Sequence, residues 1–304
     1  MRDLFKDEFI CYNYFRDNNI NTRAELRKCL KEKPLKGIRQ AIIETFFSDY
    51  GKSLRSKKSR NVSGKNYKVA CINDLHIPYH DEKVIKLVFD CIVDSQPNQL
   101  VLNGDILDCY HMSDFIKDPS NNKYMQDECD TFYSLFSYLR KYIPKTKIIY
   151  VLGNHEDRVE RQINKNPQFF GIRNILLPEL LRCKDLDIQI YNKKYVLKDF
   201  LFIHGNKSSS RSSYTAKAEF EDHKCRNGIS AHTHRLGCYH QTYDQEVTTW
   251  YENGCLCTLN PDYIKDVVNW QHGFSFIDFY KNINQVTQIL IKEYKFMYNG
   301  VIYE

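Results

Sequence analysis

Carboxylate, amide and imidazole side chains follow a series of apolar stretches in this chain. The segments "NDLH", "NGDILD", "GNHEDR", "FLFIHG" and "GISAHTH" all place them where such a stretch ends. Together they supply Asp74, His76, Asp105, Asp108, Asn154, His155, His204, His232 and His234. One such motif could be an ordinary turn or a buried histidine. Their joint occurrence, always after a predicted strand, favours a single functional site.

This donor set suits two-metal hydrolysis of phosphoesters. Carboxylate and imidazole together favour Mn²⁺, Fe²⁺ or Zn²⁺ over Ca²⁺. Two such ions, about 3.5–4 Å apart, can share a bridging carboxylate and generate hydroxide at neutral pH. The sequence therefore predicts a site for two divalent metal ions, with Mn²⁺ as the first candidate.

A shared site requires strands whose carboxyl ends meet. Residues 67–73, 99–104 and 147–153 have the character of buried strands, and the faces at 84–92 and 132–139 between them have helical periodicity. This alternation predicts an α/β fold with a largely parallel sheet covered by helices. In such a sheet the carboxyl ends of the strands converge on one crevice.

Strands dominate from about residue 187 onward. The segments "DIQIYN", "FLFIHG", "GISAHT", "LGCYHQTY" and "FSFIDFY" have strand character. We expect them to form a second, more antiparallel sheet packed on the first.

The first 66 residues differ from the rest of the chain. Residues 1–50 are predicted to be helical, with Thr22 and Glu25 in capping-box spacing at the start of a helix that runs to about Lys33. Three short helices are compatible with a helix-turn-helix module, although many such units bind nothing. Residues 51–66 carry Lys and Arg but no acid. They are either a solvated linker or a linker that also touches phosphates. We expect residues 67–304 to form the catalytic domain.

Composition narrows the class of protein. The 304 residues, 42% of them hydrophobic, can form one large core, and no apolar run approaches the roughly 18 residues of a membrane span. The net charge of +6 is a mild excess that does not establish a nucleic-acid partner. Eleven cysteines without a C-x-x-C pair indicate reduced thiols and a cytoplasmic protein.

The motifs "DLH", "GDILD", "GNHE", "HG" and "AHTH" resemble those of the calcineurin-like metallophosphoesterase superfamily, over about residues 67–280. The resemblance implies a four-layer α/β/β/α sandwich, here with a small N-terminal helical module. The stretches "DLHIPYHD", "GNHEDR" and "AHTHRLG" are similar to a subgroup often encoded by bacteriophages and mobile elements. A phage-encoded member would act in the host cytoplasm.

The resemblance also implies a role for each motif residue. One metal ion would be bound by Asp74, His76, Asp105 and His234, with Asp105 bridging, and the second site would be completed by Asn154, His204 and His232. His155 would protonate the leaving oxygen and would be oriented by Asp108, whereas Glu156 would be structural.

The chain departs from the superfamily pattern at two places. Ala231 replaces the usual Gly before the H-x-H motif, which is tolerable if the backbone there is not left-handed. Cys109 and Tyr110 follow "GDILD", where protein Ser/Thr phosphatases carry Arg-Gly. The missing arginine removes a phosphate clamp, and the candidate replacements are Arg158, Arg161 and Arg235. Arg161 is more readily explained as a solvated surface arginine, so Arg158 and Arg235 are the predicted substrate-binding residues.

Three functions are compatible with these features. The basic linker and the possible helix-turn-helix favour a phosphodiesterase or nuclease acting on nucleic acid, either DNA or RNA, or on a nucleotide. The alternatives are a phosphomonoesterase acting on protein or small-molecule phosphates, and a catalytically silent DNA-binding scaffold. Loss of ligands would indicate a scaffold, and all seven proposed ligands are present.

Overall fold

The computed structural model of the protein describes Tyr14 and residues 23–32, 66–118, 121–172, 174–224, 226–260, 268–281 and 283–304. The chain divides into two units, Met1–Gly64 and Lys65–Glu304. In the first unit, helix α2 (Arg23–Glu32) begins directly after Thr22, as the capping-box spacing predicts. The rest of the predicted helix-turn-helix, and nearly all of the linker at 51–66, lie outside the described residues. The domain limits therefore remain predictions.

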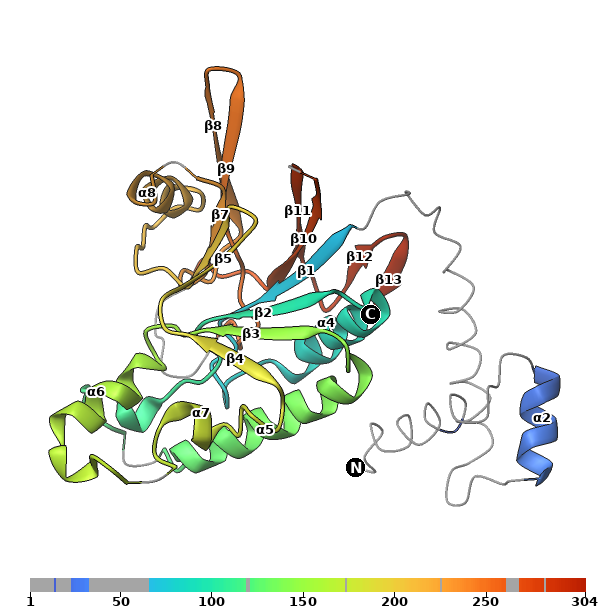
Figure 1. Ribbon diagram of the computed structural model, residues 1–304, viewed down its shortest axis with the longest axis horizontal. Coiled ribbons are helices and arrows are strands. Elements are labelled where there is room, and N and C mark those ends of the chain that lie inside the picture. Colours follow the sequence, from blue (N-terminus) through green and yellow to red (C-terminus); the bar gives the residue numbers. More distant parts are fainter. Residues whose placement is uncertain are drawn as a thin grey trace. The chain divides into compact units, whose positions relative to one another are not determined.

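The second unit contains a mixed sheet of six strands in the order β11-β10-β1-β2-β3-β4 (Figure 1). These are β1 (Tyr67–Ile72), β2 (Gln99–Asn103), β3 (Lys147–Val151), β4 (Ile188–Tyr191), β10 (Gly273–Tyr280) and β11 (Ile283–Leu290). Strands β1 to β4 run parallel, whereas β10 pairs antiparallel with β1, and β11 pairs antiparallel with β10. The predicted alternation of parallel strands and helices is confirmed.

A second sheet has the order β5-β6-β7-β9-β8. Its strands are β5 (Lys194–Leu197), β6 (Phe200–Ile203), β7 (Gly228–Ser230), β8 (Gly237–Tyr243) and β9 (Glu246–Glu252). The predicted membership was wrong for "DIQIYN" and "FSFIDFY", which form β4 and β10 of the first sheet. The reason is packing: Ile188 of β4, and Phe274 and Phe276 of β10, belong to the core beneath the helices of the first sheet. The second sheet is also mixed, since β7 lies parallel to both β6 and β9.

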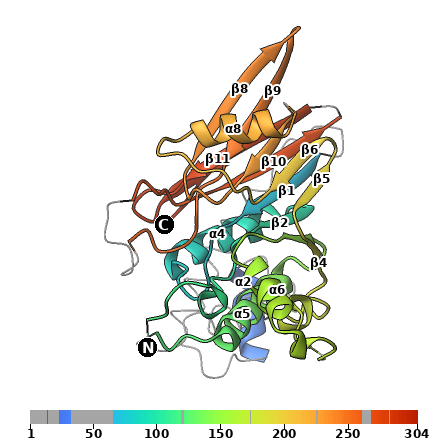
Figure 2. The same ribbon diagram turned by 90° about the vertical axis from the view of Figure 1, so that its left-hand side faces the viewer.

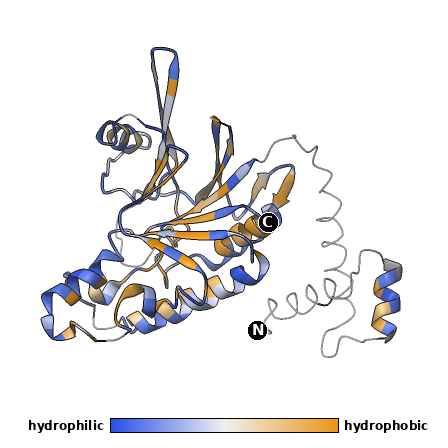
Figure 3. Ribbon diagram, viewed as in Figure 1, coloured by the Kyte–Doolittle hydropathy of each residue, from blue (hydrophilic) through white to orange (hydrophobic). Residues whose placement is uncertain are grey.

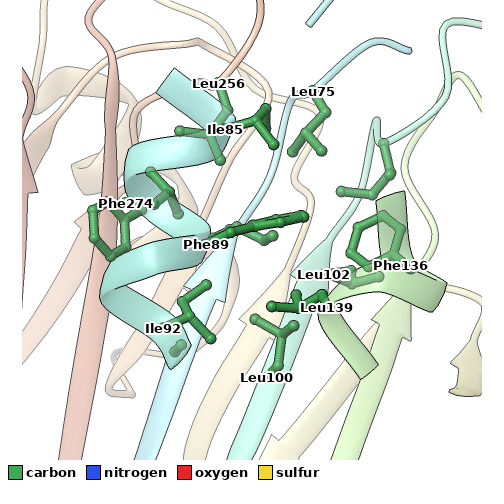
Figure 4. Packing of buried hydrophobic residues seen from close by; sticks show 14 of the residues in the cluster. Leu75, Ile85, Phe89, Ile92, Leu100, Leu102, Phe136, Leu139, Leu256 and Phe274 are labelled. Atoms are coloured by element: carbon green, nitrogen blue, oxygen red, sulfur yellow. The ribbon is translucent and has the colours of Figure 1, made fainter. Parts of the chain in front are cut away.

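Helices cover the outer face of the first sheet. Helix α4 (Glu82–Ser95) begins where the Asp81 side chain accepts hydrogen bonds from the amides of Lys83 and Val84, and α5 (Met125–Tyr142) packs beside it. Figure 4 shows apolar side chains of both helices meeting over the strands. The rings of Phe89 and Phe136 lie 5.9 Å apart there.

The two sheets pack face to face through a separate apolar cluster. Val69, Val101 and Ile149 of the first sheet meet Phe200 and Phe202 of the second, all buried. Helix α8 (Tyr214–Asp222) covers the outer face of the second sheet, where Phe220 contacts the cluster containing Trp250 (Figure 2). The predicted α/β/β/α sandwich is therefore confirmed.

The remaining elements are short helices between the strands and a two-stranded sheet at the C-terminal end. They are η1 (Tyr110–Met112), α6 (Asp157–Lys165), η2 (Pro167–Phe169), α7 (Leu177–Leu180), β12 (Phe296–Tyr298) and β13 (Val301–Tyr303). Apolar residues concentrate in the strands, whereas the tip of the β8–β9 hairpin is hydrophilic (Figure 3). Among the described helices, none combines the length and apolarity required to cross a bilayer.

Candidate dinuclear metal centre

Loops at the carboxyl ends of β1, β2, β3, β6 and β7 bring the nine predicted site residues together. Three groups of ligand atoms form there, each with its members within 4.8 Å of one another. The first consists of Asp74, His76 and His234, and the second of Asp105, His204 and His232. A third, of His76, Asp105 and His155, shares one member with each of these two.

In the first group, the ligand atoms face one another, and a buried carboxylate oxygen among them has no hydrogen-bond donor. Nε2 of His234 lies 3.3 Å from Oδ1 of Asp74, and Nε2 of His76 lies 3.7 Å from it. The two Nε2 atoms are only 3.1 Å apart. Oδ1 of Asp74 is nevertheless buried and accepts no hydrogen bond. A buried, unpaired acceptor facing two imidazoles fits a divalent cation.

The second group has the same character. Nε2 of His204 lies 3.1 Å from Oδ2 of Asp105 and 3.2 Å from Oδ1 of Asn154. The imidazole rings of His204 and His232 meet edge to face at 5.3 Å. Carboxylate, amide and imidazole donors therefore face one position, as a second ion requires.

Asp105 lies between the two groups. Besides its contact with His204, Oδ2 of Asp105 is 3.9 Å from Nε2 of His76, a member of the first group. The position is compatible with the predicted bridging carboxylate.

The ring nitrogens that face away from the site set the orientation of the histidines. Nδ1 of His76 donates to the carboxylate of Asp108 at 3.1 Å, and Nδ1 of His204 donates to the carbonyl oxygen of Asn103 at 3.0 Å. Such hydrogen bonds leave Nε2 directed at the site, which is the usual arrangement for histidines that bind metals.

The cluster is strongly coupled electrostatically. Burial alone would raise the pKa of Asp74, but His234 and His76 outweigh it and hold this pKa well below its usual range. Burial opposes protonation of His204 and His234, yet Asp105 and Asp74 respectively raise their pKa values to about 9. Without a metal ion, protons on these histidines thus balance the carboxylate charge.

The backbone at the site is locally strained. Asp74, His76, Asp105, His232 and His234 all have φ between 47° and 72°, in the left-handed region. Non-glycine residues seldom adopt this conformation, and they cluster at functional sites. The concern about the Ala231 replacement is removed, because Ala231 has no positive φ.

Two glycines allow the loops to approach one another. A Cβ atom on Gly153 would collide with the carboxylate of Asp105, and one on Gly104, whose φ is +88°, would collide with the ring of His204. The Gly of "GNHE" therefore makes room for the neighbouring strand tip.

His155 lies beside the second group with its own set of partners. Its Nδ1 donates to the backbone carbonyl of Asp108 at 2.7 Å, and its Nε2 is 3.7 Å from Oδ2 of Asp105. Arg158 donates to the same Asp108 carbonyl at 2.9 Å and to Nε2 of His155 at 2.9 Å. Asp108 thus contacts His155 chiefly through its main chain, while its carboxylate lies closer to His76.

Arg235 is directed away from the metal ligands. Its side chain is only 11% exposed, its Nε lies 3.6 Å from Glu252, and its Nη2 donates to the carbonyl oxygen of Ser209. Arg235 therefore anchors the 206–213 loop that follows His204.

Glu156 organises the two neighbouring loops. Its buried carboxylate accepts hydrogen bonds from the amides of Asp105, Leu107 and Gly153 at 2.8–3.0 Å, and from the hydroxyl of Tyr150 at 2.7 Å. These contacts support the structural role predicted for it.

Sequence reasoning missed two features around the site. Sγ of Cys257 lies 3.7 Å from Nδ1 of His234, and the buried carboxylate of Glu128 accepts a hydrogen bond from the amide of Cys109 at 2.7 Å. Neither partner is near the other in the sequence, so no local signal predicts these contacts.

Comparison with known proteins agrees with this geometry. The family model for calcineurin-like phosphoesterases matches residues 67–269. Gene 54 protein of Mycobacterium phage L5 is 24% identical over 228 residues, covering 69% of this chain and 88% of the phage protein. Gene 54 protein of Mycobacterium phage D29 is 24% identical over 255 residues, covering 78% of this chain and 98% of the phage protein. These relatives confirm the resemblance to phage-encoded proteins.

Among solved structures, Vps29 of Chaetomium thermophilum aligns with a TM-score of 0.41 and 14% identity, covering 78% of this chain and 92% of Vps29. The family match spans more than half of the chain and contains all the strand-end motifs. This chain therefore belongs to the calcineurin-like phosphoesterase family and is a metal-dependent phosphoester hydrolase.

Proposed function

We propose that the protein is a phosphodiesterase that acts on nucleic acid or nucleotides with two Mn²⁺ ions, in the cytoplasm of a phage-infected host. Asp74, His76 and His234 would hold one ion, Asn154, His204 and His232 the other, and Asp105 both. When bound, the ions would activate water and offset the charge on the phosphoryl oxygens.

His155 is the proposed general acid. Its Nδ1 proton is held by the Asp108 carbonyl, so Nε2 is the atom that faces the reacting bond. Arg158 donates to this Nε2 at 2.9 Å. A substrate phosphoryl group would accept the Arg158 hydrogen bonds instead. His155 could then be protonated at Nε2 and donate that proton to the leaving oxygen.

The observation that carries the diester preference is the position of Arg235. A phosphomonoester dianion needs more positive charge around it than a diester monoanion. Arg235 is committed to Glu252 and Ser209, whereas Arg158 contacts His155 and the exposed Arg161 reaches the Asn154 carbonyl at 3.4 Å. With Arg235 occupied by these partners, the positive charge left at the site suits a diester better than a monoester.

Aromatic side chains after Asp108 support a nucleic-acid substrate. His111 stacks on Tyr124 with ring centroids 5.1 Å apart, and Tyr110 meets His111 edge to face at 5.2 Å. Tyr124 is 60% exposed and Phe115 is 78% exposed. Exposed rings beside a phosphoesterase centre can stack on nucleobases, typically for about 1–3 kcal/mol per base.

The test compares bis-p-nitrophenyl phosphate, p-nitrophenyl phosphate, a phosphopeptide and a labelled single-stranded oligonucleotide, all with Mn²⁺. We expect faster hydrolysis of the diester than of either monoester, and cleavage of the oligonucleotide. Tyr124→Ala should raise KM for the oligonucleotide and leave the small diester unaffected. Tyr214→Ala, on α8 and 58% exposed, is the matched control. A preference for monoesters would overturn the proposal in favour of a phosphatase.

A further inference from the structure

Two buried thiols lie close to the imidazole of His234. Sγ of Cys255, Sγ of Cys257 and a ring nitrogen of His234 lie within 4.8 Å of one another, and all three residues are buried. Cys257 is 3.7 Å from Nδ1 of His234, whereas Nε2 of the same ring faces Asp74. The two thiols therefore adjoin the dinuclear centre from the opposite side of one imidazole.

The backbone holds the two cysteines in place. They are separated by one residue in an extended segment, so their side chains project to the same side while Leu256 enters the helix-covered core. The amide of Cys255 donates to the Gln271 carbonyl at 3.0 Å, and the amide of Leu256 donates to the Asp74 carbonyl at 3.1 Å. Nε2 of His272 donates to the Cys257 carbonyl at 2.7 Å.

The histidine is tied to the same segment. The amide of Gln271 donates to the His234 carbonyl at 2.8 Å, so one short stretch of chain positions both Cys255 and His234. The three donors are thus arranged by main-chain hydrogen bonds before any ligand binds, which lowers the entropic cost of binding.

The spacing matches a thiophilic metal ion. Zn–S and Zn–N bonds of about 2.3 and 2.0 Å place neighbouring ligands of a tetrahedral ion about 3.5–3.8 Å apart. The observed Sγ to Nδ1 distance is 3.7 Å. Two thiolates with an imidazole select Zn²⁺ and similar soft ions over Mn²⁺, which prefers oxygen ligands.

We propose that Cys255, Cys257 and Nδ1 of His234 form a binding site for a thiophilic ion of the Zn²⁺ class, which adjoins the dinuclear centre and shares the His234 imidazole with it. With Nε2 of His234 on the dinuclear centre, binding displaces three protons to solvent, one from each thiol and one from Nδ1, and the ion forms bonds to the two sulfurs and to Nδ1 of the resulting bridging imidazolate. The site does not depend on which phosphoester the enzyme hydrolyses.

The test uses Cd²⁺ as a spectroscopic probe on protein already saturated with Mn²⁺. Cd²⁺ bound to thiolates gives an ultraviolet charge-transfer band that oxygen and nitrogen ligands do not produce. We expect the band to saturate at about one Cd²⁺ per chain, with a parallel change in Trp fluorescence, because the Trp270 ring lies 4.2 Å from that of His234.

Variants separate this site from other thiols. Cys257→Ser should abolish the stoichiometric band and the fluorescence change while Mn²⁺ content is retained. Cys238→Ser is the matched control, because Cys238 also lies beside an imidazole, 3.5 Å from Nε2 of His240, but outside the cluster. If Cys257→Ser does not retain Mn²⁺, Cys255→Ser decides in its place. Absence of the band in the wild type, or its equal loss in the control, would overturn the proposal.

Discussion

Loading the dinuclear centre with Mn²⁺ should release protons. Without a metal ion, burial opposes protonation of His76, His204 and His234, but nearby carboxylates raise the pKa values of these three histidines. The pKa of His76 is raised well above its usual range, and the pKa values of His204 and His234 are raised to about 9. By contrast, burial and the neighbouring His204 lower the pKa of His232. Because metal ligands must be neutral imidazoles, filling both sites at pH 7 should release about three protons per chain.

Calorimetric titration with Mn²⁺ measures this number. At one pH, in several buffers of different ionisation enthalpy, the slope of observed heat against buffer enthalpy gives the protons released. The affinity for Mn²⁺ should also rise with pH through about 9, where His204 and His234 lose their protons. His240→Asn, which alters a histidine of the β8–β9 hairpin paired with Thr249, should leave the slope unchanged.

The same pKa values determine the stability of the metal-free protein. Protonated His204 and His234 stabilise the fold fully below their unfolded pKa of about 6.5, and their contribution disappears as the pH rises through about 9. In the metal-loaded protein, this pH-dependent loss of folding stability should not occur. Release of no protons would refute the view that imidazolium groups balance the site carboxylates before metal binds.

Three further predictions concern single residues. His155→Ala should lower turnover about 10²–10⁴-fold, less for a p-nitrophenol leaving group, while elemental analysis still finds two Mn²⁺ per chain; an empty site would show that His155 is a ligand. Glu156→Ala should reduce the free energy of unfolding by about 3–5 kcal/mol in urea titrations, because buried amides lose their acceptor, and an unchanged midpoint would contradict this role. Burial raises the pKa of Glu128 to about 8, so the folded state holds an extra proton above pH 4.5. Because of this proton, the free energy of unfolding should fall by about 1.4 kcal/mol per pH unit up to about pH 8. Glu128→Gln should remove this pH dependence.

The convergence of the strand-end residues could be predicted from the sequence because it depends on a regular rule. Parallel strands present their carboxyl ends at one edge, so polar residues after β1, β2 and β3 had to converge. The pairing of later strands followed no such rule. Strand character identifies "DIQIYN" and "FSFIDFY" as strands, but their partners depend on which core their side chains enter.

Roles that depend on side-chain direction were harder to predict than roles that depend on strand position. Arg158 and Arg235 both follow site motifs, yet the first reaches His155 and the second turns to Glu252. The difference lies in burial: the Glu252 carboxylate is wholly inaccessible, accepts hydrogen bonds from the Ser213 amide and the Thr233 hydroxyl, and lies 3.6 Å from Nε of Arg235. Positive charge near a phosphoesterase motif therefore indicates substrate contact only where no buried acid competes for it.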